Sequence, residues 1–485
     1  MSPSPPPTDT PAPWRRRVID RLEKSGRFRT ATLVTALAGM FATTFPITIL
    51  TISLGPIAEE FQAAETTIAW VISAPMLLSA VFFPLLGKLG DLRGHRQIFL
   101  VGFGFSTVVA GLTAFAWDEW SLIGLRTLAA ILGGATQPTS MALIFSVYPP
   151  EQRVRAMGWW SMTGAAAPAL GLALGGPLVE LFGWRVVFGL QAGISLISLA
   201  LAYAVLRETP RKSVRFDFAG SVALAFGIGG FMFALGSLRL LEGDPTIPLL
   251  ACGVGALGLA AFLSIEKRVE EPLLPLAFFR SRNFSATLVT NAMTSAGYMG
   301  SFVIAPFFLL SLGFSETAAS FLILMRTGAL TIASPMGGTL GERLGERGAS
   351  LFGCSTMTLG LGLAAWGALN ESLVVFLLGL IGQGLGHGWS QPSITAAISR
   401  SVDESDLGIA AASNRLFGQG GAAFGITMLT LVYAGAKTPV SFATTFFVAT
   451  ALSAISVVTA LWIGASKLEL DRADEDARVA PAVGR

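Results

Sequence analysis

Fourteen apolar stretches, each long enough to cross a bilayer, occupy most of this chain of 485 residues. A membrane-spanning helix needs about 20 mostly apolar residues. Only 13% of the residues are charged, against about 25% in a soluble domain. The sequence therefore predicts an all-α polytopic membrane protein with fourteen transmembrane helices. The expected spans lie near residues 31–57, 67–87, 98–117, 121–147, 157–179, 186–206, 217–238, 247–265, 284–311, 316–338, 348–369, 373–399, 408–434 and 440–464.

The distribution of basic residues predicts the orientation of these spans. If the N-terminus is cytoplasmic, all but six of the 33 Lys and Arg residues fall in cytoplasmic tails and loops. Cytoplasmic loops of membrane proteins carry such an excess of Lys and Arg. We therefore expect a multi-pass protein of the cell (plasma) membrane with both termini in the cytoplasm. The six exceptions are Arg185, Arg239 and Lys437 in outer loops, and Arg126, Arg326 and Arg415 within spans.

Two polar decapeptides indicate an internal repeat. GKLGDLRGHR (87–96) and GTLGERLGER (338–347) align glycine for glycine, 251 residues apart. Each follows the second helix of a set of six, and eight helices lie between them. The pattern predicts two six-helix repeats with two helices inserted between them. The expected organisation is a disordered basic tail (1–30), a first bundle (31–206), a two-helix insert with linkers (207–283), a second bundle (284–464) and a cytoplasmic tail (465–485).

A set of small residues supports the same repeat. Residues spaced four, three and four apart share one face of a helix, and this spacing occurs twice, at an offset of 250 residues. Close packing explains small residues in membrane helices, but it does not explain the common offset. The first set, with Gly176 beside it, is a predicted helix-packing motif. The two sets are Gly164, Pro168, Gly171 and Gly175, and Asn414, Gly418, Gly421 and Gly425.

Taken together, the motifs resemble those of the major facilitator superfamily, specifically its fourteen-helix branch of drug–proton antiporters. GKLGDLRGHR is similar to the family's loop between the second and third helices, and GAAAPALGLALGG resembles the antiporter motif of the fifth helix. LRTLAAILGGATQP places Arg126 at the family's fourth-helix arginine. The resemblance extends over residues 31–464. One departure is that the acidic residue usual in the first helix aligns with Pro46.

The resemblance implies a secondary transporter that exports a small amphipathic organic compound by alternating access, with proton-coupled antiport. A uniporter, importer or sensor of the same fold remains the alternative. The chain lacks a G-x-x-x-x-G-K-[ST] loop for ATP, and with two histidines it offers little for a hydrolytic triad. We therefore expect no enzyme, no cofactor, no metal and no nucleic-acid partner. The expected partners are a small-molecule substrate, protons and membrane lipid, and the expected state is a monomer.

The decapeptides supply candidate residues for a conformational latch. Asp91 lies at a helix–loop junction, where a carboxylate can accept hydrogen bonds from free amides at a neighbouring helix N-terminus. Arg93 and Arg96 can pair with Asp91 or with anionic headgroups. By the resemblance, this loop favours one state of the transport cycle, while the plainer interpretation is a basic anchor. Glu342 and Arg347 are the corresponding candidates in the second repeat.

Three residues within the apolar spans are candidates for the transport path or for proton coupling: Arg126, Arg326 and His387. An arginine in the middle of a span costs about 2.5–3.5 kcal/mol to insert and normally faces the interior or water. For Arg326, a bond to backbone carbonyls is the alternative. Histidine can titrate near neutral pH, so His387 could carry the proton, although a neutral histidine with a hydrogen bond to a neighbouring helix is the plainer interpretation. Asp91, Glu180 or the substrate could carry the proton instead.

Overall fold

All regular structure in the described part of the chain is helical. The computed structural model describes residues 12–464, except 212–216, 238–244, 270–273, 275, 403–406 and 434–436, so the tail expected at 465–485 lies outside it. The elements are α1 (Pro13–Lys24), α2 (Phe28–Thr44), α3 (Pro46–Phe61), α4 (Glu65–Ile68), α5 (Trp70–Arg93), α6 (His95–Thr113), α7 (Glu119–Gly133), α8 (Thr136–Val147), α9 (Pro150–Phe182), α10 (Trp184–Val205), α11 (Phe218–Gly236), α12 (Thr246–Glu266), a short 3-10 helix (Leu276–Arg280), α13 (Arg282–Ser311), α14 (Glu316–Leu369), α15 (Leu373–Ser399), α16 (Leu407–Tyr433) and α17 (Pro439–Ala460).

Twelve helical segments of the described residues are long and apolar enough to cross a membrane. The spans expected at 316–338 and 348–369 both fall within the 54-residue element α14, which is kinked at the non-helical Gly345 and counts as one candidate span. The span expected at 67–87 lies on α5, whose apolar part is the shorter stretch Trp70–Ser79. The all-helical membrane fold is therefore confirmed, whereas the count of fourteen is not.

Prolines explain where single predicted spans are divided into two helices. The first span breaks between α2 and α3, at Pro46, because proline has no amide hydrogen to donate to the preceding turn. The span at 121–147 is likewise interrupted between α7 and α8, four residues before Pro138. Both breaks fall inside predicted spans, so the apolar pattern alone did not locate them.

The residues just before the first span are helical. We expected a disordered tail over residues 1–30, and the structure corrects this for Pro13–Lys24, which form α1. Residues 1–11 lie outside the described part. One side of α1 is buried at Arg15 and Ile19, because this side packs against α2 and α10. Tertiary contacts thus order a stretch whose polar composition had suggested disorder.

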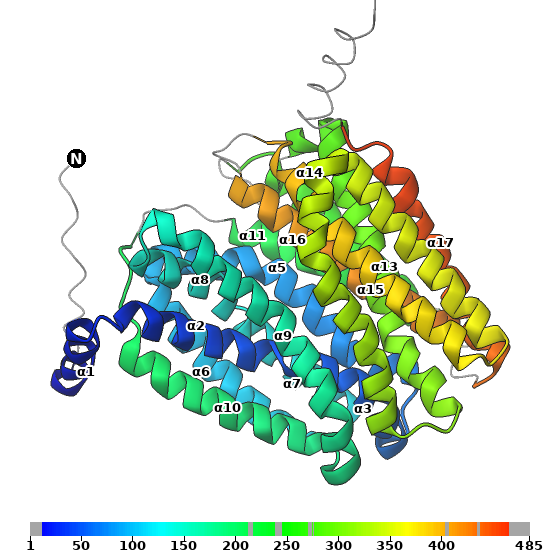
Figure 1. The fold of residues 1–485 in the computed structure, drawn as a ribbon, viewed down its shortest axis with the longest axis horizontal. Helices are drawn as coiled ribbons and strands as arrows, with labels where there is room; N and C mark the ends of the chain where they lie inside the picture. Colours follow the sequence, from blue (N-terminus) through cyan, green and yellow to red (C-terminus); the bar gives the residue numbers. More distant parts are fainter. Residues whose placement is uncertain are drawn as a thin grey trace, which may run out of the picture. The chain divides into compact units, whose positions relative to one another are not determined.

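The chain divides into two compact units. Unit 1 comprises residues up to Leu273 together with Gly313–Phe321, and unit 2 comprises Leu274–Leu312 and the residues from Leu322 onward. In unit 1, α2 lies beside α10 (Figure 1) and also packs on α8 and α9. In unit 2, α13 is the central helix, with α15, α16 and α17 packed on it. The predicted two-helix insert, α11 and α12, clusters with unit 1.

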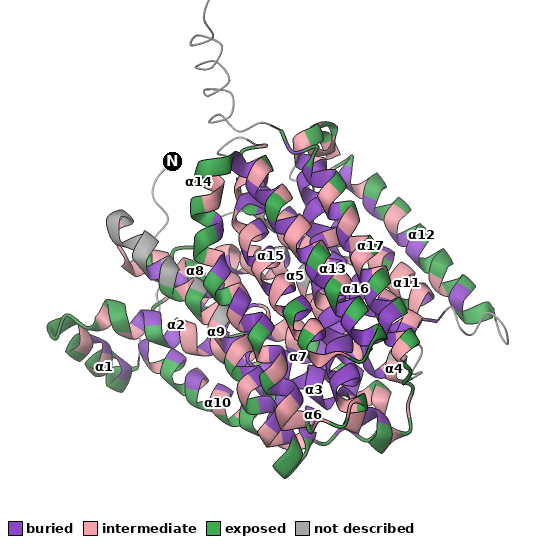
Figure 2. Cartoon of the chain, turned by 45° about the vertical axis from the view of Figure 1, so that its right-hand side comes forward, coloured by how far each residue is buried: buried purple, intermediate pink, exposed green. Residues whose placement is uncertain are grey.

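Glycines hold the two inserted helices together. A Cβ atom on Gly230 would lie 2.6 Å from the amide nitrogen of Gly255, and one on Gly258 would lie 2.8 Å from the Cα of Gly227. Such close contact of backbones is how small residues join membrane helices. The outer side of α12 is apolar and exposed (Figure 2), with Leu257 74% exposed, as expected of a helix that faces lipid.

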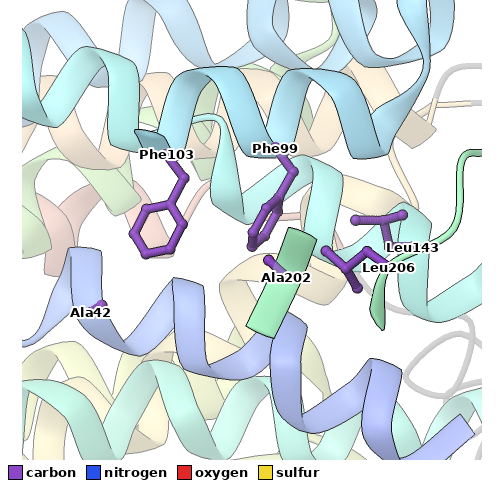
Figure 3. Packing of buried hydrophobic residues seen from close by; sticks show 6 residues of the cluster. All are labelled: Ala42, Phe99, Phe103, Leu143, Ala202 and Leu206. Atoms are coloured by element: carbon purple, nitrogen blue, oxygen red, sulfur yellow. The ribbon is translucent and has the colours of Figure 1, made fainter. Parts of the chain in front are cut away.

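Aromatic side chains fill the interior of unit 1. Phe99 and Phe103 point from α6 toward Ala202 of α10 and Ala42 of α2, with Leu143 and Leu206 beside them (Figure 3). All six side chains are almost completely buried. The small alanines opposite the rings let α2 and α10 come close to α6. This cluster fixes the end of α10, which carries part of the site described below.

Replacing Phe99 by alanine tests this core. We expect Phe99→Ala to lower the free energy of unfolding by about 3–5 kcal/mol, because it removes a buried ring and leaves a cavity. The matched control is Phe105→Ala on the same helix, since Phe105 is 61% exposed. Unfolding of both variants in detergent, followed by circular dichroism, measures the effect. Equal losses for the two variants would contradict the assignment of this core.

Candidate functional site

The helix breaks of the two decapeptides lie at matching glycines. Gly94 separates α5 from α6 with a φ of 101°. Gly345 breaks α14 with a φ of 75°, and it is the residue that aligns with Gly94 at an offset of 251. Positive φ values are readily adopted only by glycine. The repeat expected from the decapeptides is therefore present in the backbone of both units.

Glu208 caps the helix that follows the first break. Its carboxylate accepts hydrogen bonds from the backbone amides of Arg96 and Gln97, at 2.9 and 3.0 Å. The hydroxyl of Thr209 accepts a third bond, from the amide of His95, at 3.0 Å. A negative charge at a helix N-terminus is favourable because the free amides and the macrodipole make that end positive. The carboxylate also leaves no room for a Cβ on Gly94.

Glu208, not Asp91, thus performs the capping role that the sequence suggested for Asp91. Asp91 lies one turn before His95, and its carboxylate is 3.4 Å from the Nε2 of that imidazole, a distance that suits an ion pair when the histidine is protonated. Arg96 is largely buried and donates to the carbonyl of Tyr203 at 3.3 Å. Its guanidinium also lies over the Tyr203 ring, 5.5 Å from the centroid. Arg93 is exposed.

In the second repeat, a different carboxylate is paired. Glu342 and Arg347 are exposed, and neither makes an ion pair within the described residues. Glu346 is instead buried and lies 2.9 Å from the Nε of Arg400. The pair borders a pocket of about 300 Å³. The pocket is lined by Gly338, Gly341, Glu342, Glu346, Pro392, Ser393, Ala396 and Arg400.

The predicted helix-packing motif makes close backbone contacts in both units. Gly171 and Gly175 of α9 face the backbone of α3 and the residue before it, and the carbonyl of Pro168 accepts a hydrogen bond from Thr48 at 2.7 Å. In unit 2, Gly421 and Gly425 of α16 approach backbone carbonyls of α13. Gly164 of the same motif contacts Met40, and Gly176 faces residues 316–320 of unit 1.

Arg126 is buried in unit 1. Only 4% of its surface is exposed, and its guanidinium lies 6.0 Å from the centre of the Phe188 ring. The Nε atom has no hydrogen-bond partner among the described residues. This arginine therefore lies in the interior of unit 1, with a donor that the described residues do not satisfy.

Arg326, Tyr298 and His387 form a stack of three side chains in unit 2, the aromatic–cation stack. The guanidinium of Arg326 lies 3.6 Å from the centre of the Tyr298 ring. The imidazole of His387 lies parallel to the same ring, with centroids 4.1 Å apart and an angle of 9°. Arg326 and His387, the two candidates for the transport path in this unit, thus both contact the ring of Tyr298. Cation–π contacts of this kind stabilise a desolvated guanidinium by about 2 kcal/mol.

The two nitrogen-bearing ends of the stack, Arg326 and His387, differ in accessibility. Arg326 is fully buried and donates to the backbone carbonyl of Tyr298. A bond of this kind was the alternative that the sequence left open for Arg326. Its Nε and Nη1 atoms have no partner among the described residues. His387 is only partly buried, and its Nδ1 is also unbonded within the described chain. The stack therefore holds hydrogen-bonding capacity that unit 2 does not satisfy.

Glycines bring the helices of this stack together. A Cβ on Gly388 would lie 2.7 Å from the side chain of Ala333, and Gly384 lies directly against the carbonyl of Arg326. Both contacts join α15 to the first half of α14. The glycines around His387 thus let the backbones of these two helices approach closely.

An amide network lies on the same helices. Asn291 of α13 donates to the backbone and side-chain oxygens of Asn414 on α16, both at 2.8 Å. Gln391 of α15 donates to the side-chain oxygen of Asn291 at 3.2 Å. Buried polar networks of this kind fix the relative position of helices when their members are satisfied. The network ties together three helices of unit 2.

Sequence reasoning missed Glu208, Tyr298 and Asn291. A weak signal existed for two of them. Tyr298 is one of only four tyrosines, and it lies well inside a predicted span. Glu208 is the first acidic residue after the sixth predicted span, but nothing in the sequence showed which helix it would cap. Asn291 showed no pattern that marked it.

The two units, their matching helix breaks and the candidate spans are those of a multi-pass membrane protein. The family model of the Major Facilitator Superfamily matches residues 33–290 and 287–483, one match for each half. The chain belongs to this superfamily.

Curated relatives are named as drug transporters. The chain is 30% identical over 374 residues to the "Tetracenomycin C resistance and export protein" of Streptomyces glaucescens, a match that covers 72% of this chain and 66% of that protein. It is 26% identical over 425 residues to "Multidrug transporter protein MdtP" of Bacillus subtilis (strain 168), covering 85% of this chain and 77% of the relative. The chain is thus related to drug-resistance transporters.

A solved structure shows the same fold. The peptide transporter POT, crystallised in complex with sulfate, has a TM-score of 0.66 with this chain at 16% identity. The similarity covers 89% of this chain and 95% of that transporter. At this identity the likeness concerns the fold alone.

The cap on α6 can be tested by hydrogen exchange. Glu208→Gln keeps the shape of the side chain but removes the charge, and a hydrogen bond to a charged group contributes about 1 kcal/mol more than a neutral one. We expect the amides of Arg96 and Gln97 to exchange about fivefold faster in this variant. Glu59→Gln, at an exposed carboxylate, is the control and should leave both rates unchanged. Unchanged rates in Glu208→Gln would refute the cap.

Proposed function

We propose that this chain exports small amphipathic organic compounds across the plasma membrane by alternating access, driven by antiport of protons. The relatives named for resistance and export support the direction and the kind of substrate. In this proposal the chain works as a monomer that crosses the membrane fourteen times, with both termini in the cytoplasm. Two additions to the twelve candidate spans would give fourteen. α14 is broken at Gly345 and can supply two spans instead of one, and α5, with 24 residues, is long enough to be a further span.

The observation that carries the proposal is the aromatic–cation stack in the interior of unit 2. A buried guanidinium with unsatisfied donors is costly in a membrane protein and marks a functional position. The rings of Tyr298 and Phe302 supply apolar faces beside these donors. The centre of the Phe302 ring lies 4.9 Å from the guanidinium of Arg326. An amphipathic molecule offers both an apolar surface and a polar group. Arg126 in unit 1 would supply the matching polar contact of the transport path.

His387 is the proposed coupling group. Histidine gains and loses a proton between pH 5 and 8, and this one is partly accessible while stacked on a ring that also contacts Arg326. A movement of α13, α14 or α15 that opens the stack changes how readily the imidazole binds a proton. The family's first-helix carboxylate is replaced by Pro46, so another group must take its role.

The loops at the two helix breaks form the proposed latch. In unit 1, Asp91, Arg93 and Arg96 lie around the capped N-terminus of α6. Arg96 anchors this loop to Tyr203, so the loop has one well-defined conformation that a conformational change would have to release. In unit 2 we assign this role to Glu342 and Arg347, which lie beside the ion pair of Glu346 and Arg400.

Transport into vesicles tests the proposal. Purified protein in liposomes with an imposed pH gradient should accumulate tetracenomycin C or ethidium against its concentration gradient. His387→Gln should still exchange the compound across the membrane but should lose at least about tenfold in uphill accumulation, since general acid–base groups contribute on the order of a hundredfold or more. The ratio of uphill accumulation to exchange is the readout.

His95→Gln, at the chain's other histidine, is the matched control and should keep this ratio even if the rate of transport changes. Equal ratios for wild type and His387→Gln would exclude the histidine as the coupling group. Equilibration of the compound by wild type, with no uphill accumulation under the pH gradient, would instead favour the uniporter alternative.

A further inference from the structure

Helix α1 lies where two spans leave the membrane. It packs against the start of α2 and the end of α10 (Figures 1 and 2). These are the ends of the candidate spans Phe28–Phe61 and Trp184–Val205. Because the apolar core of the bilayer stops where spans end, α1 lies at the level of the lipid headgroups, whichever side of the membrane it occupies.

Three contacts hold α1 in this position. Arg15 donates to the carbonyl of Leu206, and Ile19 is almost fully buried. Glu23 forms an ion pair of 2.7 Å with Arg207. The helix is therefore already ordered before any ligand binds, which lowers the entropic cost of binding.

One stripe of α1 is basic and faces outward. Trp14, Arg17, Arg21 and Lys24 are spaced three, four and three apart, so they share one side of a helix with 3.6 residues per turn. All four are exposed. Of the two acidic residues of α1, Glu23 lies on another side, whereas Asp20, three residues after Arg17 and four before Lys24, borders the stripe, so three cations stand against one carboxylate. Within the described residues, none of the three cations of this basic stripe makes an ion pair.

An aromatic pair stands at one end of the basic stripe. The rings of Trp14 and Tyr203 have centroids 6.0 Å apart, and each residue is about half exposed, at 48% and 51%. Tryptophan and tyrosine favour the membrane–water interface because one part of the ring system is apolar and the other polar. The pair therefore places apolar surface for lipid chains beside cations for lipid phosphates.

We propose that the basic stripe of α1 is a binding site for anionic lipid headgroups. Guanidinium groups pair with phosphate oxygens in a bidentate manner, and basic amphipathic helices bind anionic membrane surfaces in this way. The adjoining aromatic pair and the position at the ends of the spans favour a lipid over free phosphate. The ligand would also stabilise Leu206 and Arg207, which directly precede the Glu208 cap on α6.

The full-length protein in neutral detergent, titrated with fluorescent phosphatidylglycerol, tests the site. The variant carrying Arg17→Gln, Arg21→Gln and Lys24→Gln should bind this lipid on the order of 100-fold more weakly, at roughly fivefold per basic residue near an anionic surface. The control carrying Arg16→Gln, Lys267→Gln and Arg268→Gln loses the same charge at exposed positions and should bind within about twofold of wild type. If the triple variant does not fold, Arg17→Gln and Arg21→Gln alone should each lose roughly fivefold.

Three results would overturn the proposal. One is unchanged binding by the stripe variants, and another is an equal loss in the control, which would mean that net charge alone attracts the lipid. The third is displacement of the lipid by inorganic phosphate in large excess, which would indicate a site for free anions. Phosphatidylcholine with the same chains should bind wild type no better than it binds the stripe variant. Because the readout is binding, it does not depend on the proposed transport activity.

Discussion

Close contact between helix backbones is the interaction on which both units depend. The interior of a bilayer contains no water, so apolar side chains gain little by leaving lipid for protein, and helices associate through packing instead. In unit 1, Gly171 and Gly175 let α9 touch the start of α3, and in unit 2, Gly421 and Gly425 let α16 touch α13. The same register in both units means that each bundle is built around the same pair of contacts.

Because the bilayer interior contains no water, a buried polar group must find its hydrogen-bond partners within the protein or in a bound molecule. Polar side chains inside a membrane protein persist where they are satisfied or where they have a function. Asn291 and its amide partners are satisfied and join three helices. Arg126 and Arg326 are not fully satisfied by the described residues, and each lies inside a different unit. Under the proposed function, this contrast distinguishes the polar groups that hold a bundle together from those that would contact a transported molecule.

The sequence predicted the internal repeat, but it did not predict which distant residues come into contact when the chain folds. The decapeptides predicted a repeat, and Gly94 and Gly345, which align in it, both have a positive φ and interrupt a helix. Spacing along one helix could not reveal that Glu208, 112 residues beyond Arg96, caps α6, or that Tyr298 stacks on His387. Such contacts depend on which helices become neighbours. Disorder was expected for α1 because its burial against α2 and α10 is invisible in a polar dodecapeptide.

Alternating access, as proposed for this chain, requires the two units to open first toward one side of the membrane and then toward the other. Distances between spin labels measure this directly, in a Cys252→Ser background because Cys252 is exposed. One label pair replaces the exposed residues Gln97 and Thr339, near the two helix breaks, and the other replaces Glu119 and Asn370, at the opposite ends of the spans. Addition of a transported compound should shift the two distances in opposite directions, because rigid units that close at one end open at the other. Two distances that stay fixed, or that change in the same direction, would contradict alternating access.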